Sequence, residues 1–138
     1  MAKSLSGKMG IKPHVRAIFI KAPEEVRKAI DQPEANISSS LRGNFDYIHF
    51  FANTQAELQK KFPTLKSHLK PTGMLWISWP KGGKQGTDLT LPKVIKTGYD
   101  YGLVESKTLS VNAIWSALKF THPKKGKVYN NSYGNLKK

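Results

Sequence analysis

Short apolar runs recur along the chain and predict the buried strands of a sheet. VRAIFI at 15–20 is rich in β-branched residues, FDYIHFFAN at 45–53 is almost continuously apolar, and MLWISWP occupies 74–80. Short runs without strict alternation are typical of strands covered on both faces. A weaker run at 37–41 predicts a further short strand.

The segments 23–30, 54–69 and 91–101 carry helix signals. The second begins with TQAE at 54–57, which has the spacing of a capping box. Pro63 inside this helix is expected to kink or split it. The apolar positions of the three helices recur every three or four residues and are expected to face the sheet: Val26, Ala29, Ile30, Leu58, Phe62, Leu65, Leu69, Leu91, Val94, Ile95 and Gly98.

Two β-type runs, 103–111 and 114–122, are close enough in sequence to predict an antiparallel hairpin. The order β-α-β-β-α-β-α-β-β predicts a Rossmann-like α/β three-layer sandwich, with a mostly parallel sheet and this C-terminal hairpin. Residues 1–12 are expected to be a flexible lead-in, 13–122 a single domain and 123–138 a flexible basic tail.

Composition narrows the classes of protein to consider. The 138 residues include no cysteine, which excludes disulfides, thiol nucleophiles and thiolate metal sites. No apolar run approaches the roughly 18 residues that would span a bilayer, so no membrane partner is expected. The first residues lack the apolar core of a secretory signal, and a cytoplasmic location is therefore the expectation.

The formal net charge is +14, from 23 lysines and arginines against 9 acids, and no acid follows Glu105. Such an imbalance predicts either a solvated lysine-rich surface or salt-dependent, sequence-independent contact with nucleic acid. Lysine reads base edges poorly compared with arginine, which favours the first interpretation. The residues that would carry the contact are Lys119, Lys124, Lys125, Lys127, Lys137 and Lys138.

The segment LKPTGMLWISWP at 69–80 and the closing hairpin are similar to the second half of a class I S-adenosylmethionine-dependent methyltransferase. The chain also resembles a family of small standalone bacterial domains of unknown function. The matching motifs are GIKP at 10–13, WPK at 79–81, TDL at 87–89 and WSAL at 115–118. The resemblance covers about residues 10–122 and implies a fold, with no established activity and no functional residues to carry over.

Two features of true methyltransferases are missing from the sequence. Their first strand runs into a glycine-rich loop, and their second strand ends in an acid that holds the ribose of the cofactor. Here the first turn is KAPE at 21–24, without glycine, and 37–41 contains no acid. We therefore expect no cofactor, and the sequence argues against S-adenosylmethionine.

Ligands of open α/β sheets bind beyond the carboxyl ends of the strands. The strand end with the strongest ligand-binding features is 80–88, because its glycines let the backbone approach a ligand closely and its lysines supply positive charge. This loop either binds an anion or simply makes a turn. The candidate ligand-binding residues are Asn53, Thr54, Lys81, Gly82, Gly83, Lys84, Thr87 and Asp88.

Neither a catalytic residue nor a metal ligand is predicted. The four histidines are scattered, and His49, inside a strand, is expected to be a hydrogen-bonded core residue. The sequence thus leans away from an enzyme and favours a non-catalytic binding module for an anionic small molecule or partner. Nucleic-acid association and a degenerate methyltransferase-like enzyme are the alternatives, and the sheet edge or hairpin leaves room for a homodimer.

Overall fold

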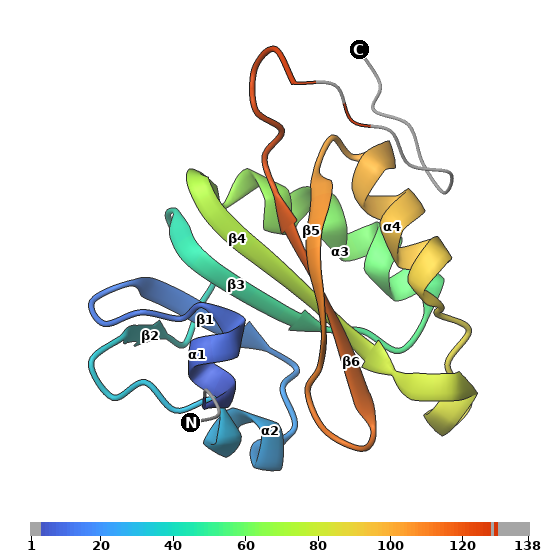
Figure 1. Ribbon diagram of the computed structural model, residues 1–138, viewed down its shortest axis with the longest axis horizontal. Coiled ribbons are helices and arrows are strands. Elements are labelled where there is room, and N and C mark those ends of the chain that lie inside the picture. The colour runs from blue at the N-terminus through green and yellow to red at the C-terminus, as the bar shows by residue number, and fades with distance from the viewer. Residues whose placement is uncertain (1–3, 128, 130–138) are drawn as a thin grey trace.

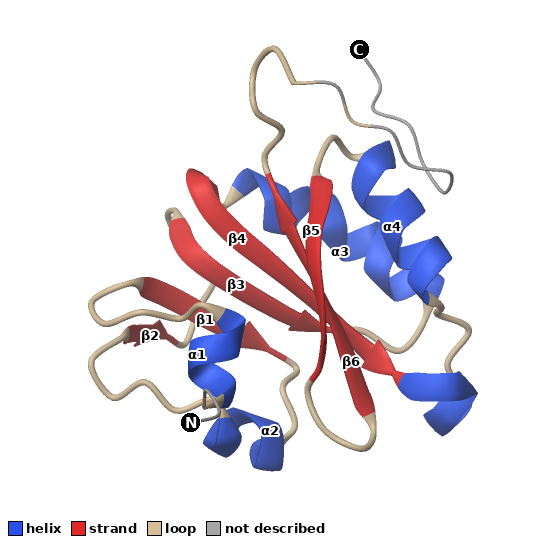
Figure 2. Ribbon diagram, viewed as in Figure 1, coloured by secondary structure: helices blue, strands red, loops and turns tan. Residues whose placement is uncertain are grey.

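The computed structural model describes residues 4–127 and 129, and its centre is one six-stranded sheet (Figures 1 and 2). The strand order is β2-β1-β3-β4-β6-β5. β2, β1, β3 and β4 are parallel, whereas β6 is antiparallel to both β4 and β5. The strands are β1 (Arg16–Ile20), β2 (Asn36–Ser38), β3 (Phe45–Phe51), β4 (Leu69–Pro80), β5 (Val104–Ser110) and β6 (Trp115–Thr121).

The helices form a layer on each face of the sheet, which confirms the predicted Rossmann-like sandwich. Met9, Val26 and Ile30 pack on one face with Tyr47 and Trp76. On the other face, α3 and α4 bury residues such as Phe62 and Tyr99. Within the described residues, every helix is too short or too polar to cross a membrane. The helices are α1 (Leu5–Met9), α2 (Glu24–Ala29), α3 (Gln55–Ser67), the short 3-10 segment η1 (Lys81–Gly86) and α4 (Leu91–Asp100).

Residues 4–12 differ from the flexible lead-in expected there. They form α1, which Ser4 caps by accepting a hydrogen bond from the Gly7 amide at 3.2 Å. Met9 is fully buried, and its carbonyl accepts a hydrogen bond from the Trp76 indole at 2.9 Å. A helix of one turn is too short to show apolar periodicity, so only the tertiary contact reveals it. Residues 1–3, 128 and 130–138, which include Lys137 and Lys138, lie outside the described part.

Three local expectations are also corrected. α3 is not split at Pro63 and continues to Ser67; the carbonyl that loses its donor belongs to Gln59, an exposed residue. β4 begins at Leu69 rather than 74, since a register shift lets Leu69 pair with Phe45. Leu91 is 37% exposed instead of facing the sheet.

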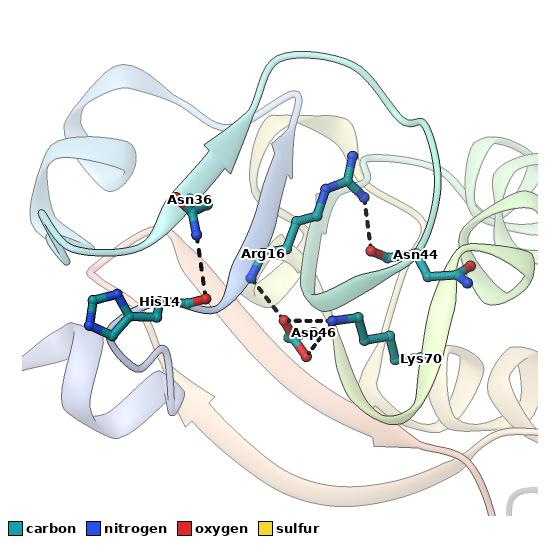
Figure 3. A network of polar contacts seen from close by, with 6 residues as sticks. All are labelled: His14, Arg16, Asn36, Asn44, Asp46 and Lys70. Carbon is teal, nitrogen blue, oxygen red and sulfur yellow. Dashed lines mark hydrogen bonds and ion pairs between the residues drawn. The ribbon is translucent and has the colours of Figure 1, made fainter.

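A network of polar contacts lies at the amino edge of the sheet, where the parallel strands begin (Figure 3). Asp46 accepts a hydrogen bond from the Arg16 amide at 2.8 Å and pairs with Lys70 at 3.2 Å. Burial raises the pKa of the Asp46 carboxyl, but the Arg16 amide and Lys70 outweigh it and hold the pKa below its usual value. The Arg16 guanidinium donates to the Asn44 carbonyl at 2.8 Å. Both oxygens of Asp46 are thus engaged at this edge.

Candidate functional site

The carboxyl ends of β1, β3 and β4 meet at one edge of the sheet, where the chain leaves at Lys21, Asn53 and Lys81 (Figure 1). The strands are parallel and adjacent, so these residues, distant in sequence, become neighbours. This is the edge at which open α/β sheets bind ligands.

The first turn of α3 carries the predicted capping box. Thr54 Oγ1 accepts from the Glu57 amide at 3.1 Å, and Glu57 Oε1 accepts from the Asn53 amide at 2.8 Å. The other Glu57 oxygen forms an ion pair with Lys21. Burial raises the pKa of Glu57, but Lys21 and the amides of Asn53 and Thr54 outweigh this and lower it. Glu57 therefore stays ionised and neutralises Lys21.

Asn53 is the residue whose hydrogen bonding is incomplete. Its Nδ2 donates to the Gln85 carbonyl at 3.3 Å, which fixes the orientation of the amide. The Asn53 backbone carbonyl accepts from the Thr87 hydroxyl. Asn53 Oδ1 is shielded from solvent, and no donor among the described residues bonds to it. An unpaired buried acceptor costs about 1–3 kcal/mol, so its presence at this edge is a signal of ligand binding.

Backbone strain flanks Asn53 on both sides. Lys21, after β1, has φ 60°, and Gln85, in the segment after β4, has φ 56°. In the described part of the chain, His14 is the one other non-glycine residue with positive φ. Such conformations cost about 1–3 kcal/mol each and concentrate at functional sites. The turn after β1 thus forms without a glycine, because Lys21 takes the left-handed conformation.

The structure gathers four of the predicted ligand-binding residues and separates the others. Asn53, Thr54, Thr87 and Asp88 are linked through the start of α3, where the Gln55 amide donates to Asp88 Oδ1 at 2.9 Å. That hydrogen bond, the largest influence, lowers the pKa of Asp88, which already occupies the anion position at this helix terminus.

The basic and glycine-rich residues of the loop do not converge with them. Lys81 donates to the Ser110 hydroxyl of β5. Gly82, Gly83 and Lys84 are exposed, and a Cβ at either glycine would meet nothing within 4 Å. The glycines serve the turn itself, with φ of 55° and 75°. Sequence reasoning did not identify Lys21 or Gln85 as site residues, since neither belongs to a motif and only the fold brings them to Asn53.

A buried polar chain lies below this edge on the α1 and α2 face. His49 Nε2 lies 2.7 Å from Ser78 Oγ, and His49 Nδ1 lies 3.1 Å from the Tyr47 hydroxyl. His49 and Ser78 are fully buried, and the His49 ring stacks on Phe51 at 4.3 Å. Burial lowers the pKa of His49 to about 3, so the ring is neutral. The expectation of a hydrogen-bonded core histidine is confirmed.

The predicted nucleic-acid residues lie in two places. Lys119 is half-buried on β6, directly opposite Lys107 of β5. Burial, and then the charge of Lys107, lowers the pKa of Lys119. Lys124, Lys125 and Lys127 follow β6 and are exposed. Within residues 4–127 and 129, no cluster of three or more histidines and acids is placed to hold a metal ion.

Solved structures share this fold, although no protein-family model matches the chain and no curated protein resembles it closely. Ribosomal protein L11 methylase from Lactobacillus delbrueckii subsp. bulgaricus superposes with a TM-score of 0.56 at 15% identity, covering 87% of this chain and 76% of its own. Magnesium protoporphyrin IX methyltransferase from Synechocystis PCC 6803, with bound S-adenosylhomocysteine (SAH), superposes with a TM-score of 0.57 at 12% identity. The match covers 85% of this chain and 77% of the methyltransferase chain. Mitomycin 7-O-methyltransferase superposes with a TM-score of 0.62 at 7% identity, and the match covers 87% of this chain and 53% of the methyltransferase chain. The chain has the fold of class I S-adenosylmethionine-dependent methyltransferases.

These neighbours correct the expectation that no cofactor is involved. One methyltransferase of this fold was solved both with SAH and with S-adenosylmethionine (SAM) bound. The turn after β1 has no glycine, and Lys21 adopts the left-handed conformation there. The end of β2 does lack an acid, as the sequence indicates, and offers the Ser38 hydroxyl, which bonds to the Ser40 backbone at 2.7 Å.

Proposed function

We propose that this protein binds a small ligand of the SAM class at the carboxyl edge of its sheet, around Asn53. The observation that carries the proposal is Asn53 Oδ1, a shielded acceptor without a donor. It calls for a ligand that donates a hydrogen bond. SAM and SAH carry amino and ribose hydroxyl donors, and the fold of the chain is that of proteins which bind them.

The charges at this edge favour such a ligand over a bare anion. Lys21 is neutralised by Glu57, and Lys81 is held by Ser110. Asp88 adds a negative charge at the start of α3. Of the two lysines that suggested an anion site, Lys81 therefore contacts β5 and Lys84 is exposed. When bound, SAM supplies a transferable methyl group, while Asn53 and the turns at Lys21 and Gln85 would bind and orient it.

Thermal unfolding in the presence of SAH tests this proposal. At a concentration about tenfold above its Kd, SAH is expected to stabilise the fold by about 1.4 kcal/mol and to raise Tm by about 3–6 °C. Asn53→Ala removes the acceptor and is expected to abolish most of the shift. Asn36→Ala is the matched control, since Asn36 donates to the His14 carbonyl at the amino edge. No shift with either SAH or SAM at millimolar concentration would refute the proposal, as would an Asn53→Ala variant that responds like the parent.

A second candidate function, contact with a nucleic-acid backbone, is supported by the Lys107–Lys119 pair. Like charges directly opposite on adjacent strands destabilise a sheet. No ion pair formed within the described residues includes either lysine. Lys107 also donates to the carbonyl of Lys8 at 3.3 Å, which brings the basic end of α1 beside the pair. Two phosphates would relieve this repulsion. A cytoplasmic location remains part of both proposals.

The salt dependence of binding tests the second candidate. Anisotropy of a labelled mixed-sequence oligonucleotide, titrated between about 50 and 200 mM salt, gives the slope of log K against log salt. Lys107→Gln/Lys119→Gln is expected to reduce that slope by nearly 2, because each phosphate contact contributes about 0.9. Lys93→Gln/Lys96→Gln on α4 should leave it unchanged. If only deletion of residues 123–138 weakens binding, the contact belongs to the tail and not to this pair.

A further inference from the structure

A hollow of about 380 Å³ lies on the α3 face of the sheet, beside β1 and next to the edge around Asn53. Ile20 and Phe50 contribute to it from β1 and β3, and Lys21 from the turn that follows β1. The remaining residues, Glu57, Lys60, Lys61 and Thr64, come from α3. The volume falls within the range of small-molecule pockets and suits a ligand of about two fused rings.

The hollow exists because one connection of the fold contains no helix. The chain passes from β2 to β3 through residues 39–44 alone, although β1 lies between these two strands. Leu41, in this connection, packs into the same core as α3 and α4. Parallel strands are ordinarily joined by a longer crossover, most often a helix. In the described part of the chain the connection supplies no helix to cover the carboxyl end of β1 beside α3, and Ile20 remains only half-buried.

The side of α3 that faces this gap is charged rather than apolar. Glu57, Lys60, Lys61 and Thr64 follow each other at the three- and four-residue spacing that places them on one side of a helix. Leu58, Phe62 and Leu65 occupy the neighbouring side and are buried against the sheet. Polar side chains of α3 thus border the apolar surface at this place. A helix face that packs against another helix would carry aliphatic residues there instead.

The net charge around the hollow is positive. Lys21, Lys60 and Lys61 contribute +3 and Glu57 contributes −1, which gives +2. The Lys21–Glu57 ion pair accounts for one charge of each sign. Lys60 and Lys61 take part in none of the four ion pairs found among the described residues. Two lysines that pair with no carboxylate of the described residues therefore border the apolar surface of Ile20, and the buried Phe50 lies at the base of the hollow.

We infer that this hollow is a binding site for a small aromatic carboxylate. The ring system lies on the half-buried Ile20, above the buried Phe50, where it removes apolar surface of Ile20 from water, and the carboxylate pairs with Lys60 and Lys61. The aliphatic stems of the lysines extend the apolar contact while their ammonium groups stay hydrated. A bare anion lacks the apolar term and a neutral aromatic lacks the charge term, so both bind more weakly. The hollow shares Lys21 with the edge around Asn53 but uses neither Asn53 Oδ1 nor Gln85, and a ligand held there by Lys60 and Lys61 goes beyond the proposed function.

Amide-detected NMR titration with 2-naphthoate tests the inference. Saturable shifts are expected at the amides of Ile20, Phe50, Lys61 and Thr64. The neutral analogue 2-naphthylmethanol should bind at least about fivefold more weakly, because it lacks the charge that pairs with the lysines. Inorganic phosphate should leave the amides of Ile20 and Phe50 unshifted, because it has no apolar body.

Variants separate the two contributions to binding. Lys60→Gln/Lys61→Gln is expected to raise the Kd for 2-naphthoate about tenfold, whereas Lys93→Gln/Lys96→Gln should leave it unchanged. Thr64→Trp, at an exposed position, fills the hollow and should abolish binding while the remaining amides keep their positions. Unsaturable shifts scattered over the surface, or equal Kd values in both lysine variants, would overturn the inference. Amide shifts around Asn53 on addition of SAH would support the proposed function only. They would not count as evidence for binding of 2-naphthoate in the hollow.

Discussion

Lowering the pH from 7 to 5 is expected to reduce the free energy of unfolding by about 2 kcal/mol through His49 alone. The folded-state pKa of His49 is about 3, well below the 6.5 of a free histidine. The unfolded chain therefore binds a proton below about pH 6.5, while the folded chain does not. Stability is fully present above that pH and falls by about 1.4 kcal/mol for each pH unit until the folded pKa is approached.

The physical cause is the surroundings of the His49 ring. Ser78 and Tyr47 engage both ring nitrogens, while Phe51 and Trp76 pack around it. No carboxylate lies among these partners to stabilise an imidazolium. Burial also raises the pKa of Tyr47 above its usual value, so its hydroxyl stays neutral and supplies no counter-charge. A protonated ring would be a buried, uncompensated charge.

Urea unfolding followed by tryptophan fluorescence, repeated between pH 7 and 5, measures the effect. The window matters because the lowered pKa values of Asp46 and Glu57 affect stability only at more acidic pH. His49→Gln keeps an amide that bonds to Ser78 but removes the titrating ring, so its stability should be nearly flat over this range. Equal slopes in the parent and the variant would show that His49 is not the group responsible.

Gly98→Ala is expected to destabilise the protein by about 2–3 kcal/mol, although alanine is the better helix former. A Cβ on Gly98 would come within 2.0 Å of the Phe120 ring, which lies on β6 directly under α4. The ring has no room to retreat, since it is fully buried and meets Phe62 edge-on at 5.5 Å between centroids. Relief requires α4 to move away from the sheet. Calorimetry should show a Tm about 6–10 °C lower than that of the parent.

A double-mutant cycle separates this steric effect from helix propensity. Phe120→Leu removes the ring atoms that the new methyl would strike, at a cost of its own. In that background, Gly98→Ala should cost less than half of what it costs in the parent, because the two changes are coupled. Additive effects of the two substitutions would contradict the close contact between Gly98 and Phe120.

The predicted elements that hold in the structure rest on local signals. The run at 45–53 became β3, the TQAE capping box begins α3, and the C-terminal runs pair as a hairpin. Each depends on residues a few positions apart, whose burial or hydrogen bonding is set by the chain itself. α1 escaped prediction because its stability comes from contact with Trp76, far along the chain.

The candidate site divides in the same way. The sequence identified four of the site residues because they lie at the ends of predicted strands and helices: Asn53, Thr54, Thr87 and Asp88. Lys21 and Gln85 were not, because a left-handed backbone on a lysine or glutamine leaves no local mark. The lysines of the loop pointed to an anion, and the actual partner of Lys81, Ser110 on β5, could not be known without the fold.

By itself, then, the sequence determined the alternation of strands and helices, the mostly parallel sheet and the place of His49 in the core. These follow from periodicity, capping and burial, which act over short distances. The tertiary structure alone decided which charges are neutralised, which acceptor lacks a donor and where the sheet is left uncovered. Pairing and shielding depend on residues that are distant in sequence, and the parallel order of β1, β3 and β4 brings those residues together.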